Sequence, residues 1–405
     1  MKESLIYSWD RKLSKRVDKQ IEFNDETLRD GLQATYVRQP NLKEKIQFLE
    51  ASDSVGINSI NIGFPVSEKS EKNEIITLVN HAQENKLNIQ LECGGRMLTE
   101  DVEAIINVSQ RTGVNIEAGL FIASSKIRHI VEKWDLKDMG KIVEENISFA
   151  LKNNLPVMFV AEDTTRSHPQ TISYLYNKAI DAGATRICIC DTVGEATPAA
   201  TYNLVSFVKK EIVKDNKKIK IDWHGHNDKG LATANSLAAV AAGADCIQAA
   251  ALGIGERAGN ASMEESIFDL YTEGLTKTKL NHLRAYSEIA SKILNIDIRP
   301  NSPIIGEDIF KTATGVHAAA IKKALQLNNE FLAGNIYTSI DPALLGRTHE
   351  ILVGPISGKA NVELFLKKIN IVPNPELIES ILNKAKTENK ILSEKQILEI
   401  VKSQN

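Results

Sequence analysis

Short apolar runs alternate with longer amphipathic segments along most of the chain. Eight such runs begin at intervals of roughly 26 to 42 residues, and each has the length of a buried strand. The segments between them carry apolar residues at helical spacing, as Leu42, Ile46 and Leu49 do. The runs are Ile21–Asn24, Ile57–Ile62, Ile89–Cys93, Asn115–Phe121, Val157–Ala161, Arg186–Cys190, Ile219–His224 and Cys246–Ala251.

Eight consecutive strand–helix units over about 250 residues predict an α/β fold, the (β/α)₈ TIM barrel. An open, doubly wound sheet is the alternative. The pattern changes after the eighth unit, and a mainly helical C-terminal region of two small subdomains is expected there. The expected ranges are an N-terminal extension over 1–18, the catalytic barrel over 19–277, a helical connector over 278–345 and a small helical subdomain over 346–405.

Composition and charge narrow the function classes. The 405 residues are 42% hydrophobic and 25% charged, and a net charge of −3 gives no reason to expect nucleic acid or a membrane as partner. The four cysteines lie in apolar runs and form no C-x-x-C pair, which is typical of a reducing compartment. The N-terminus lacks the apolar core of a signal peptide, and no apolar run is long enough to span a bilayer. A cytoplasmic protein is therefore expected.

Two histidines at the end of the seventh run are the first candidates for chemistry. Asp222–Asp228 reads D-W-H-G-H-N-D. Residues two apart on a strand point to the same side, so His224 and His226 direct two imidazoles at one spot. A carboxylate would complete a site for a divalent ion. For this segment alone, two solvated histidines beside a turn are the alternative.

A candidate carboxylate follows the first run, within Phe23–Gln33, which reads F-N-D-E-T-L-R-D-G-L-Q. Asp30 could supply the missing ligand, because only the eighth strand separates the first from the seventh in a barrel. Arg29 would then lie beside the metal, where a guanidinium can stabilise an oxyanion that develops on a bound carbonyl. A surface Arg29–Asp30 ion pair is the simpler interpretation of this segment alone.

Several short motifs, taken together, resemble a known family. T-L-R-D-G-x-Q follows the first strand, G-F-P the second, E-D-T-T-R the fifth and D-T-V-G the sixth, while H-G-H-N-D and G-I-G-E-R-A-G-N belong to the seventh and eighth. The set is similar to the 2-isopropylmalate synthase, homocitrate synthase and citramalate synthase family, whose members are metal-dependent acyl-CoA condensing barrels. The resemblance runs from about Ile21 to beyond Val362.

The resemblance implies roles for residues at the strand ends. A divalent ion such as Mn²⁺, Mg²⁺ or Zn²⁺ would be held by Asp30, His224 and His226, while Arg29 and Glu162 would be catalytic. Glu162 could instead cap a helix, and Thr192 could be an ordinary turn residue. The implied substrate-binding residues are Arg96, Thr192 and Gln33, and the implied acyl-CoA loop contains Gly253, Gly255, Glu256 and Asn260.

The chain beyond the barrel extends the resemblance. Thr314–Ala318 reads T-G-V-H-A, similar to the family's S-G-I-H, whose histidine reaches the active site of the partner subunit. His317 would then be a third catalytic residue, and the protein a homodimer with composite active sites. Tyr337 is a further substrate-binding candidate. Without the resemblance, His317 would be interpreted as a structural histidine.

The implied reaction joins acetyl-CoA, the co-substrate, to a metal-bound 2-oxo acid and then hydrolyses the thioester, which makes the protein an acyltransferase. Gly94 adds no cation at the third strand, and this favours 2-oxoisovalerate and a product, 2-isopropylmalate, of leucine biosynthesis. Homocitrate or citramalate synthesis from 2-oxoglutarate or pyruvate is the alternative, and a metal-dependent aldolase or lyase is another.

Three features depart from the family's usual pattern. Asn61 replaces a glutamate at the end of the second strand, and Tyr36 stands where a glycine is common. The tail that ends at Asn405 is too short for the regulatory domain of leucine-controlled relatives, so none is expected. These departures leave the expected metal chemistry intact.

Overall fold

The structure is a computed structural model that describes residue 5 and residues 17–404. Most of the predicted N-terminal extension, 1–18, therefore lies outside the described residues. The chain divides into two compact units, Met1–Ile298 and Arg299–Asn405, and each is described by itself.

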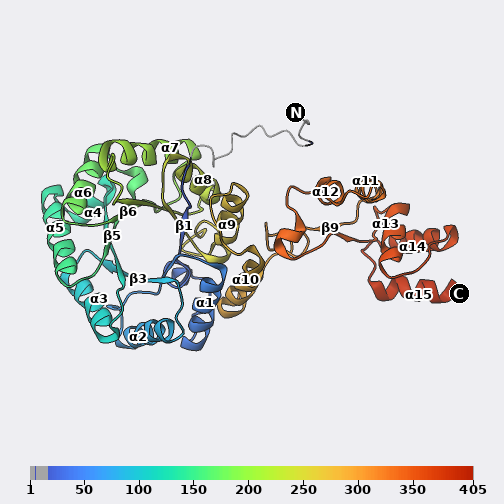
Figure 1. The fold of residues 1–405 in the computed structure, drawn as a ribbon, viewed down its shortest axis with the longest axis horizontal. Helices are drawn as coiled ribbons and strands as arrows, with labels where there is room; N and C mark the ends of the chain where they lie inside the picture. The colour runs from blue at the N-terminus through green and yellow to red at the C-terminus, as the bar shows by residue number, and fades with distance from the viewer. Residues whose placement is uncertain (1–4, 6–16, 405) are drawn as a thin grey trace. The chain divides into compact units, whose positions relative to one another are not determined.

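The first unit contains a closed barrel of eight parallel strands, which confirms the predicted fold (Figure 1). The sheet closes where β1 pairs with β8 and Asp25 lies beside Ala249. Each predicted run overlaps one strand, and the ends differ by three residues at most. The strands are β1 (Glu22–Asp25), β2 (Ser59–Asn61), β3 (Gln90–Arg96), β4 (Glu117–Ala123), β5 (Val157–Glu162), β6 (Arg186–Asp191), β7 (Lys220–Gly225) and β8 (Cys246–Ala249).

Helices form the outer layer around these strands (Figure 1). Local signals set their ends, as in the first helix, where Asn41 and Glu44 form a capping box and Gly56 ends the helix at φ 87°. The helices are α1 (Leu42–Val55), α2 (Lys69–Glu84), α3 (Thr99–Thr112), α4 (Lys126–Glu132), α5 (Leu136–Lys152), α6 (Pro169–Asp181), α7 (Pro198–Phe207) with the π-helical turn η4 (Val208–Val213), α8 (Ala232–Ala242), α9 (Met263–Thr272) and α10 (Leu280–Leu294), with 3₁₀ turns η2 (Gly31–Gln33), η3 (Thr164–Arg166) and η5 (Ala251–Gly253).

Charged side chains at the first residues of several strands close the N-terminal end of the barrel. Arg186 pairs with Glu22 and with Asp222, each at 2.8 Å, and Lys220 also pairs with Glu22. Asp222 is fully buried, so the Arg186 guanidinium offsets a carboxylate that would be costly to bury alone. This end of a barrel serves stability, which leaves the opposite end for chemistry.

The first unit continues past the predicted barrel limit of residue 277. Helix α10 packs against α1, and the Tyr286 hydroxyl donates a 2.7 Å hydrogen bond to buried Asp25. An apolar face on α10 that includes Leu283 and Ile293 is buried in the same layer. The boundary between the two units therefore falls after this helix, at Ile298, whereas the sequence analysis placed it before the helix.

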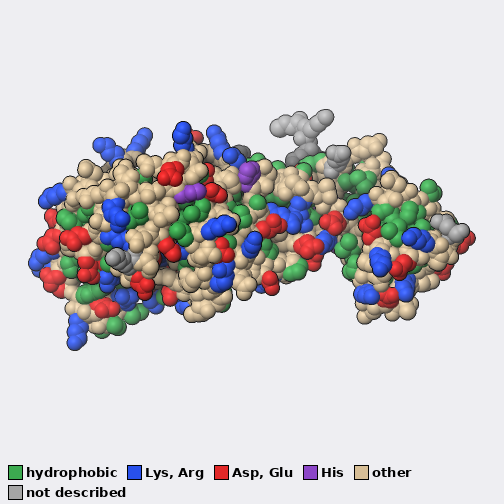
Figure 2. All heavy atoms as spheres, turned by 90° about the horizontal axis from the view of Figure 1, so that it is seen from below, with side chains coloured by type: hydrophobic (Ala, Val, Ile, Leu, Met, Phe, Trp, Pro, Cys, Tyr) green, Lys and Arg blue, Asp and Glu red, His purple; other side chains and the backbone are tan. Residues whose placement is uncertain are grey.

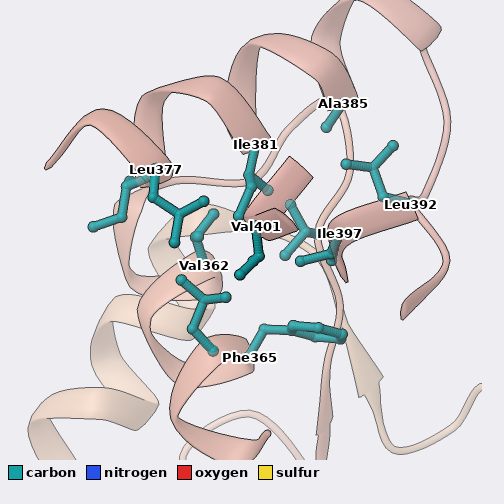
Figure 3. Packing of buried hydrophobic residues seen from close by; sticks show 11 residues of the cluster. Val362, Phe365, Leu377, Ile381, Ala385, Leu392, Ile397 and Val401 are labelled. Atoms are coloured by element: carbon teal, nitrogen blue, oxygen red, sulfur yellow. The ribbon is translucent and has the colours of Figure 1, made fainter. Parts of the chain in front are cut away.

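The second unit is mainly helical. Its last three helices share an apolar core, shown in Figure 3, to which Val362, Phe365, Leu377, Ile381, Ile397 and Val401 contribute. A short parallel strand pair, in which Lys311 lies beside Glu350, adds a small sheet that the sequence analysis did not predict. The elements are β9 (Lys311–Thr312), α11 (Gly315–Gln326), α12 (Glu330–Asn335), η6 (Pro342–Leu345), β10 (Glu350–Ile351), α13 (Lys359–Lys368), α14 (Pro375–Glu388) and α15 (Glu394–Gln404).

The surface carries both signs of charge. On the face that Figure 2 draws, Lys and Arg side chains are interspersed with Asp and Glu side chains. Among the residues that the structure describes, none of the helices is long and apolar enough to cross a membrane.

Candidate active site

A cavity of about 220 Å³ opens at the C-terminal ends of the strands, where the working face of such a barrel lies. It combines polar groups with an apolar wall. Side chains and glycines from all eight strands, or from the loops that follow them, line it. The lining residues are Glu26, Arg29, Asp30, Gln33, Asn61, Phe64, Glu92, Gly94, Gly119, Phe121, Met158, Val160, Glu162, Cys190, Thr192, His224, His226, Gln248 and Glu256.

The three predicted metal ligands meet in this cavity. One carboxylate oxygen of Asp30, Oδ2, lies 3.8 Å from Nε2 of His224 and 3.6 Å from Nε2 of His226, and the two Nε2 atoms are 3.3 Å apart. The ligand atoms all lie within 4.8 Å of one another, and all three residues are buried. Two imidazole nitrogens and one carboxylate oxygen aimed at a common point fit a divalent ion.

The electrostatics of these residues favour the metal-binding forms. Burial lowers the pKa of His224 to about 3, the neighbouring His226 adds to this, and Asp30 opposes it. Burial also lowers the pKa of His226, so both rings are neutral near pH 7. Burial alone would raise the pKa of Asp30, but Arg29 and the two imidazoles outweigh it and hold that pKa well below its usual range. A carboxylate and two neutral imidazoles are the forms that bind a metal ion.

Arg29 lies beside the proposed ligands, with its side chain 19% exposed. Its guanidinium contacts Oδ2 of Asp30 at 2.9 Å and Oε2 of Glu26 at 2.5 Å. Glu26 is 1% exposed and also accepts a 2.7 Å hydrogen bond from Nε of Arg29. Arg29 is thus a fixed cation at the cavity, with its orientation set by two carboxylates.

The loop after β8 supports Asp30 from a distant part of the sequence. Nδ2 of Asn260 donates a 2.7 Å hydrogen bond to Oδ1 of Asp30. Gly255, at φ 150°, permits this contact, because a Cβ there would lie 2.2 Å from Nδ2 of Asn260 and 2.7 Å from Asp30. Tyr36 donates a 3.3 Å hydrogen bond to the carbonyl of the same glycine. Tyr36, which stands where a glycine is common in the family, therefore adds a contact to this loop.

The predicted carboxylate Glu162, at the end of β5, lines the cavity and is paired. Nη1 of Arg128, in α4, donates a 2.6 Å hydrogen bond to Oε1 of Glu162. Burial raises the pKa of Glu162 while Arg128 opposes the rise. A carboxylate with a raised pKa that faces a cavity is suited to proton transfer near neutral pH.

Other predicted residues of the barrel occupy the same rim. Thr192 lines the cavity, and its hydroxyl accepts a 2.7 Å hydrogen bond from the backbone of Asp163. Its carbonyl accepts one of 2.6 Å from Arg257, which also pairs with Asp228. Arg257 thereby links the loops after β6, β7 and β8. Gln33 and Glu256 line the cavity as well.

Four predicted residues of the first unit do not line this cavity, namely Arg96, Gly253, Gly255 and Asn260. Arg96 pairs with Asp101 and Glu100 at the start of α3, at 2.8 and 3.0 Å, and is not among the lining residues. His317 and Tyr337 belong to the second unit, where their rings stack with centroids 3.7 Å apart. The two rings form a pair, which the sequence spacing did not indicate.

The sequence analysis missed several lining residues, of which Glu26, Phe64 and Glu92 matter most. Alternation along β3 could have identified Glu92, because Gly94, two residues on, faces the same interior. Asn24 and Asn61 donate hydrogen bonds to Glu92 at 2.5 and 3.2 Å. Burial, with the charges of Glu26 and Glu117, raises the pKa of Glu92 well above its usual value. The cavity floor is therefore polar, and burial favours the protonated form of Glu92 there.

Comparison with known proteins identifies the family. Residues 20–290 match the family described as HMGL-like, and the chain belongs to that family. It is 36% identical over 351 residues to a 2-isopropylmalate synthase of Methanocaldococcus jannaschii, which covers 86% of this chain and 63% of that protein. It is 31% identical to a homocitrate synthase of Methanopyrus kandleri, over 89% of this chain and 86% of that protein. It is also 31% identical to a 2-isopropylmalate synthase of Methylacidiphilum infernorum, over 89% of this chain and 70% of that protein.

Solved structures share the fold. An HMG-CoA lyase of Brucella melitensis superposes with a TM-score of 0.58 at 17% identity, over 68% of this chain and 99% of the lyase. An HMG-CoA lyase of Pseudomonas aeruginosa gives a TM-score of 0.57 at 18% identity, over 69% of this chain and 94% of that protein. The family assignment rests on the sequence relatives, because identities this low reveal only the common barrel.

Proposed function

We propose that this protein is an acyltransferase that condenses acetyl-CoA with a 2-oxo acid and then hydrolyses the thioester. The products would be a 2-alkylmalate and free CoA. The observation that carries the proposal is the convergence of Asp30, His224 and His226 in one cavity, with Arg29 beside them. The names of the relatives at 31% to 36% identity support it.

A divalent metal at these ligands, whether Mn²⁺, Mg²⁺ or Zn²⁺, would supply Lewis-acid polarisation of the 2-oxo acid. Arg29 is oriented by Glu26 and Asp30 to donate hydrogen bonds to an oxygen on which negative charge develops. Glu162 is the candidate base for the acetyl methyl group, because its carboxylate faces the cavity and its pKa is raised by burial. The hydrolysis step would consume one water and release CoA.

The cavity lining favours a 2-oxo acid with an apolar side chain. Arg29 is the only Lys or Arg among the described residues that line it, so the cavity offers no second cation for a second carboxylate. Phe64, Phe121 and Val160 supply an apolar wall. We therefore favour 2-oxoisovalerate, with 2-isopropylmalate as product, over 2-oxoglutarate or pyruvate, which would give homocitrate or citramalate.

The stacked pair of His317 and Tyr337 is assigned to the active site of a partner subunit in a homodimer. Tyr337 is 45% exposed, so this ring pair is available at the surface of the second unit. The barrel cavity contains no histidine other than the two proposed ligands, among the residues that line it. A further base from another chain would complete it.

The direct test is turnover by the full chain with each divalent metal, acetyl-CoA and a panel of 2-oxo acids. Free thiol release would be followed, and the products identified by mass. Thiol release should require both metal and 2-oxo acid, and the Asp30→Ala variant should release none. A lyase of the same barrel type would instead cleave a 3-hydroxyacyl-CoA and leave acetyl-CoA intact, and that result would contradict the proposal.

A further inference from the structure

A second cavity, of about 280 Å³, adjoins the first on the side of α1 and α2. Three residues line both cavities, namely Arg29, Gln33 and Phe64. The first two are polar, and each contacts the proposed metal ligand Asp30: Arg29 pairs with its carboxylate at 2.9 Å, and the Gln33 N–H donates a 3.0 Å hydrogen bond to its carbonyl. Phe64 is therefore the apolar part of the wall between the two cavities.

The Phe64 ring occupies the space that Gly94 leaves free because it has no side chain. A Cβ on Gly94 would lie 2.5 Å from the ring, so no other residue at position 94 could accept the ring in this position. The ring also meets Phe121 edge-on, with centroids 6.1 Å apart. Gly63, at φ 119°, and the 3.2 Å hydrogen bond from the Phe64 N–H to Glu71 set the backbone that aims the ring there.

In its other directions the first cavity offers no room for a longer substrate side chain. Its floor is closed by Glu92 and Gln248, both buried and hydrogen-bonded. Gly119 pairs with Gly94 across β3 and β4, but a Cβ there would overlap the Glu92 carboxyl group. The direction through Phe64 leads instead into the second cavity, which lies outside the barrel.

We infer that Phe64 limits the length of the 2-oxo acid side chain, and that the second cavity is where a longer side chain would extend if the ring were removed. The inference rests on the proposed function, since it concerns the selectivity of the same site. Gly94 contributes to this limit because the absence of a Cβ leaves room for the Phe64 ring. Phe64 is thus a specificity-determining residue.

The size of the effect follows from the loss of an apolar wall. One methylene in a hydrophobic pocket changes kcat/KM by about 10- to 200-fold. Phe64→Ala removes a whole ring and joins cavities of about 220 and 280 Å³. The second cavity is apolar at Leu28, Leu32 and Ile62, whereas Lys45, Glu71 and Glu74 make the rest polar. Phe64→Ala should therefore raise kcat/KM for 2-oxohexanoate, relative to 2-oxoisovalerate, by about tenfold.

The experiment compares the full chain with its Phe64→Ala and Phe64→Leu variants and with a control, Phe149→Ala, whose ring lies on α5 and lines neither cavity. Two quantities are measured for 2-oxobutanoate, 2-oxoisovalerate, 2-oxohexanoate and 2-oxooctanoate. The first is kcat/KM for thiol release from acetyl-CoA. The second is the dissociation constant of the 2-oxo acid with metal and without acetyl-CoA, by calorimetry.

Both Phe64 variants should favour the longer acids in both quantities, with the larger shift for alanine, and Phe149→Ala should keep the wild-type order. Phe64→Leu keeps an apolar side chain packed against Gly94, and it serves as the test if the alanine variant does not fold. Unchanged order in a folded Phe64 variant, or calorimetry in which no 2-oxo acid binds any protein, would overturn the inference. Binding without thiol release in the wild type would refute the proposed function alone, and calorimetry would still decide on Phe64.

Discussion

Asn260 donates a hydrogen bond of 2.7 Å to Asp30, a residue 230 positions earlier in the chain. The contact occupies Oδ1 of Asp30, while Oδ2 faces the two histidines. Asn260 therefore orients a proposed metal ligand and is not itself one of the proposed ligands. Such outer contacts commonly determine how tightly a metal site binds.

The first prediction concerns this contact. Asn260→Ala should weaken metal binding by about 10- to 100-fold, because Asp30 loses the donor that holds its carboxylate in place. Calorimetric titration of the metal-free chain with Mn²⁺ measures the effect. Asn177→Ala, at an exposed position of α6, is the control, and an unchanged Mn²⁺ affinity in the Asn260 variant would refute the orienting role.

Removal of one of the three proposed metal ligands should impair the protein more than Asn260→Ala does. Asp30→Ala, His224→Ala and His226→Ala should each abolish turnover and lower the bound metal content while circular dichroism stays that of the folded barrel. A chelator should inactivate the wild-type protein, and Mn²⁺, Mg²⁺ or Zn²⁺ should restore it. His282→Ala, on α10 away from the cavity, should behave as wild type. Full activity in metal-free buffer would exclude the metal assignment.

Arg29 should not be replaceable by lysine. Arg29→Lys keeps the charge but loses the planar fork that contacts Glu26 and Asp30 together. Loss of one preorganised oxyanion donor typically lowers kcat by about 10²–10³. Steady-state kinetics at saturating 2-oxo acid measures this, with dissociation constants to show that ground-state binding persists. Near wild-type kcat in either Arg29→Lys or Arg29→Ala would reduce the arginine to a structural partner of Asp30.

The ion pair of Glu162 and Arg128 predicts a pH dependence. Burial raises the pKa of Glu162, and Arg128 opposes the rise, so Arg128→Gln should raise that pKa further. A base is active when ionised; the rate is therefore lost as pH falls through its pKa, and the acid limb of the kcat/KM profile should move to higher pH in the variant. Arg284→Gln, in an exposed pair on α10, is the control.

Replacement of the base itself completes that test. Glu162→Gln should lower kcat by about 10²–10⁴ and remove the acid limb. If the limb stays at the same pH in both Arg128→Gln and Glu162→Gln, another group controls it, and Glu162 is not the base.

His317 should act across a subunit interface. His317→Ala should lose rate, by about 10²–10⁴ if the residue is a base, without losing 2-oxo acid binding. Mixing it with Asp30→Ala under subunit exchange should restore part of the activity, because one mixed dimer then has one site with both residues intact. Two Asp30→Ala preparations mixed in the same way are the control. Proven exchange with no recovery would exclude a composite site.

Much of the fold follows from the sequence alone, because its signals are local. Strand and helix periodicity requires only neighbouring residues, and it identified all eight strands of the barrel to within three residues at their ends. The two-residue period of a strand likewise brought the rings of His224 and His226 to one side. Closure of the barrel then made Asp30 a candidate third ligand, and the three side chains meet.

Contacts between distant segments needed the tertiary structure. Nothing near Asp30 in sequence indicates Asn260, and nothing near Glu162 indicates Arg128, because each pair forms only when different strand-end loops meet at one rim. The partners of Arg96 were likewise not evident, because the resemblance implies only a substrate-binding role, while Asp101 and Glu100 at the start of α3 hold its guanidinium.

The same distinction holds for the size of the substrate cavity. The sequence contains Gly94 and the G-F-P motif about thirty residues apart, and neither indicates by itself that the two touch. Only the packing of neighbouring strands β2 and β3 sets the Phe64 ring on Gly94 and divides one cavity from the next. Backbone pattern thus determined which residues are at the rim, because periodicity is a property of a single segment. The tertiary structure decided which of them touch, because side-chain contacts depend on segments that the sequence keeps apart.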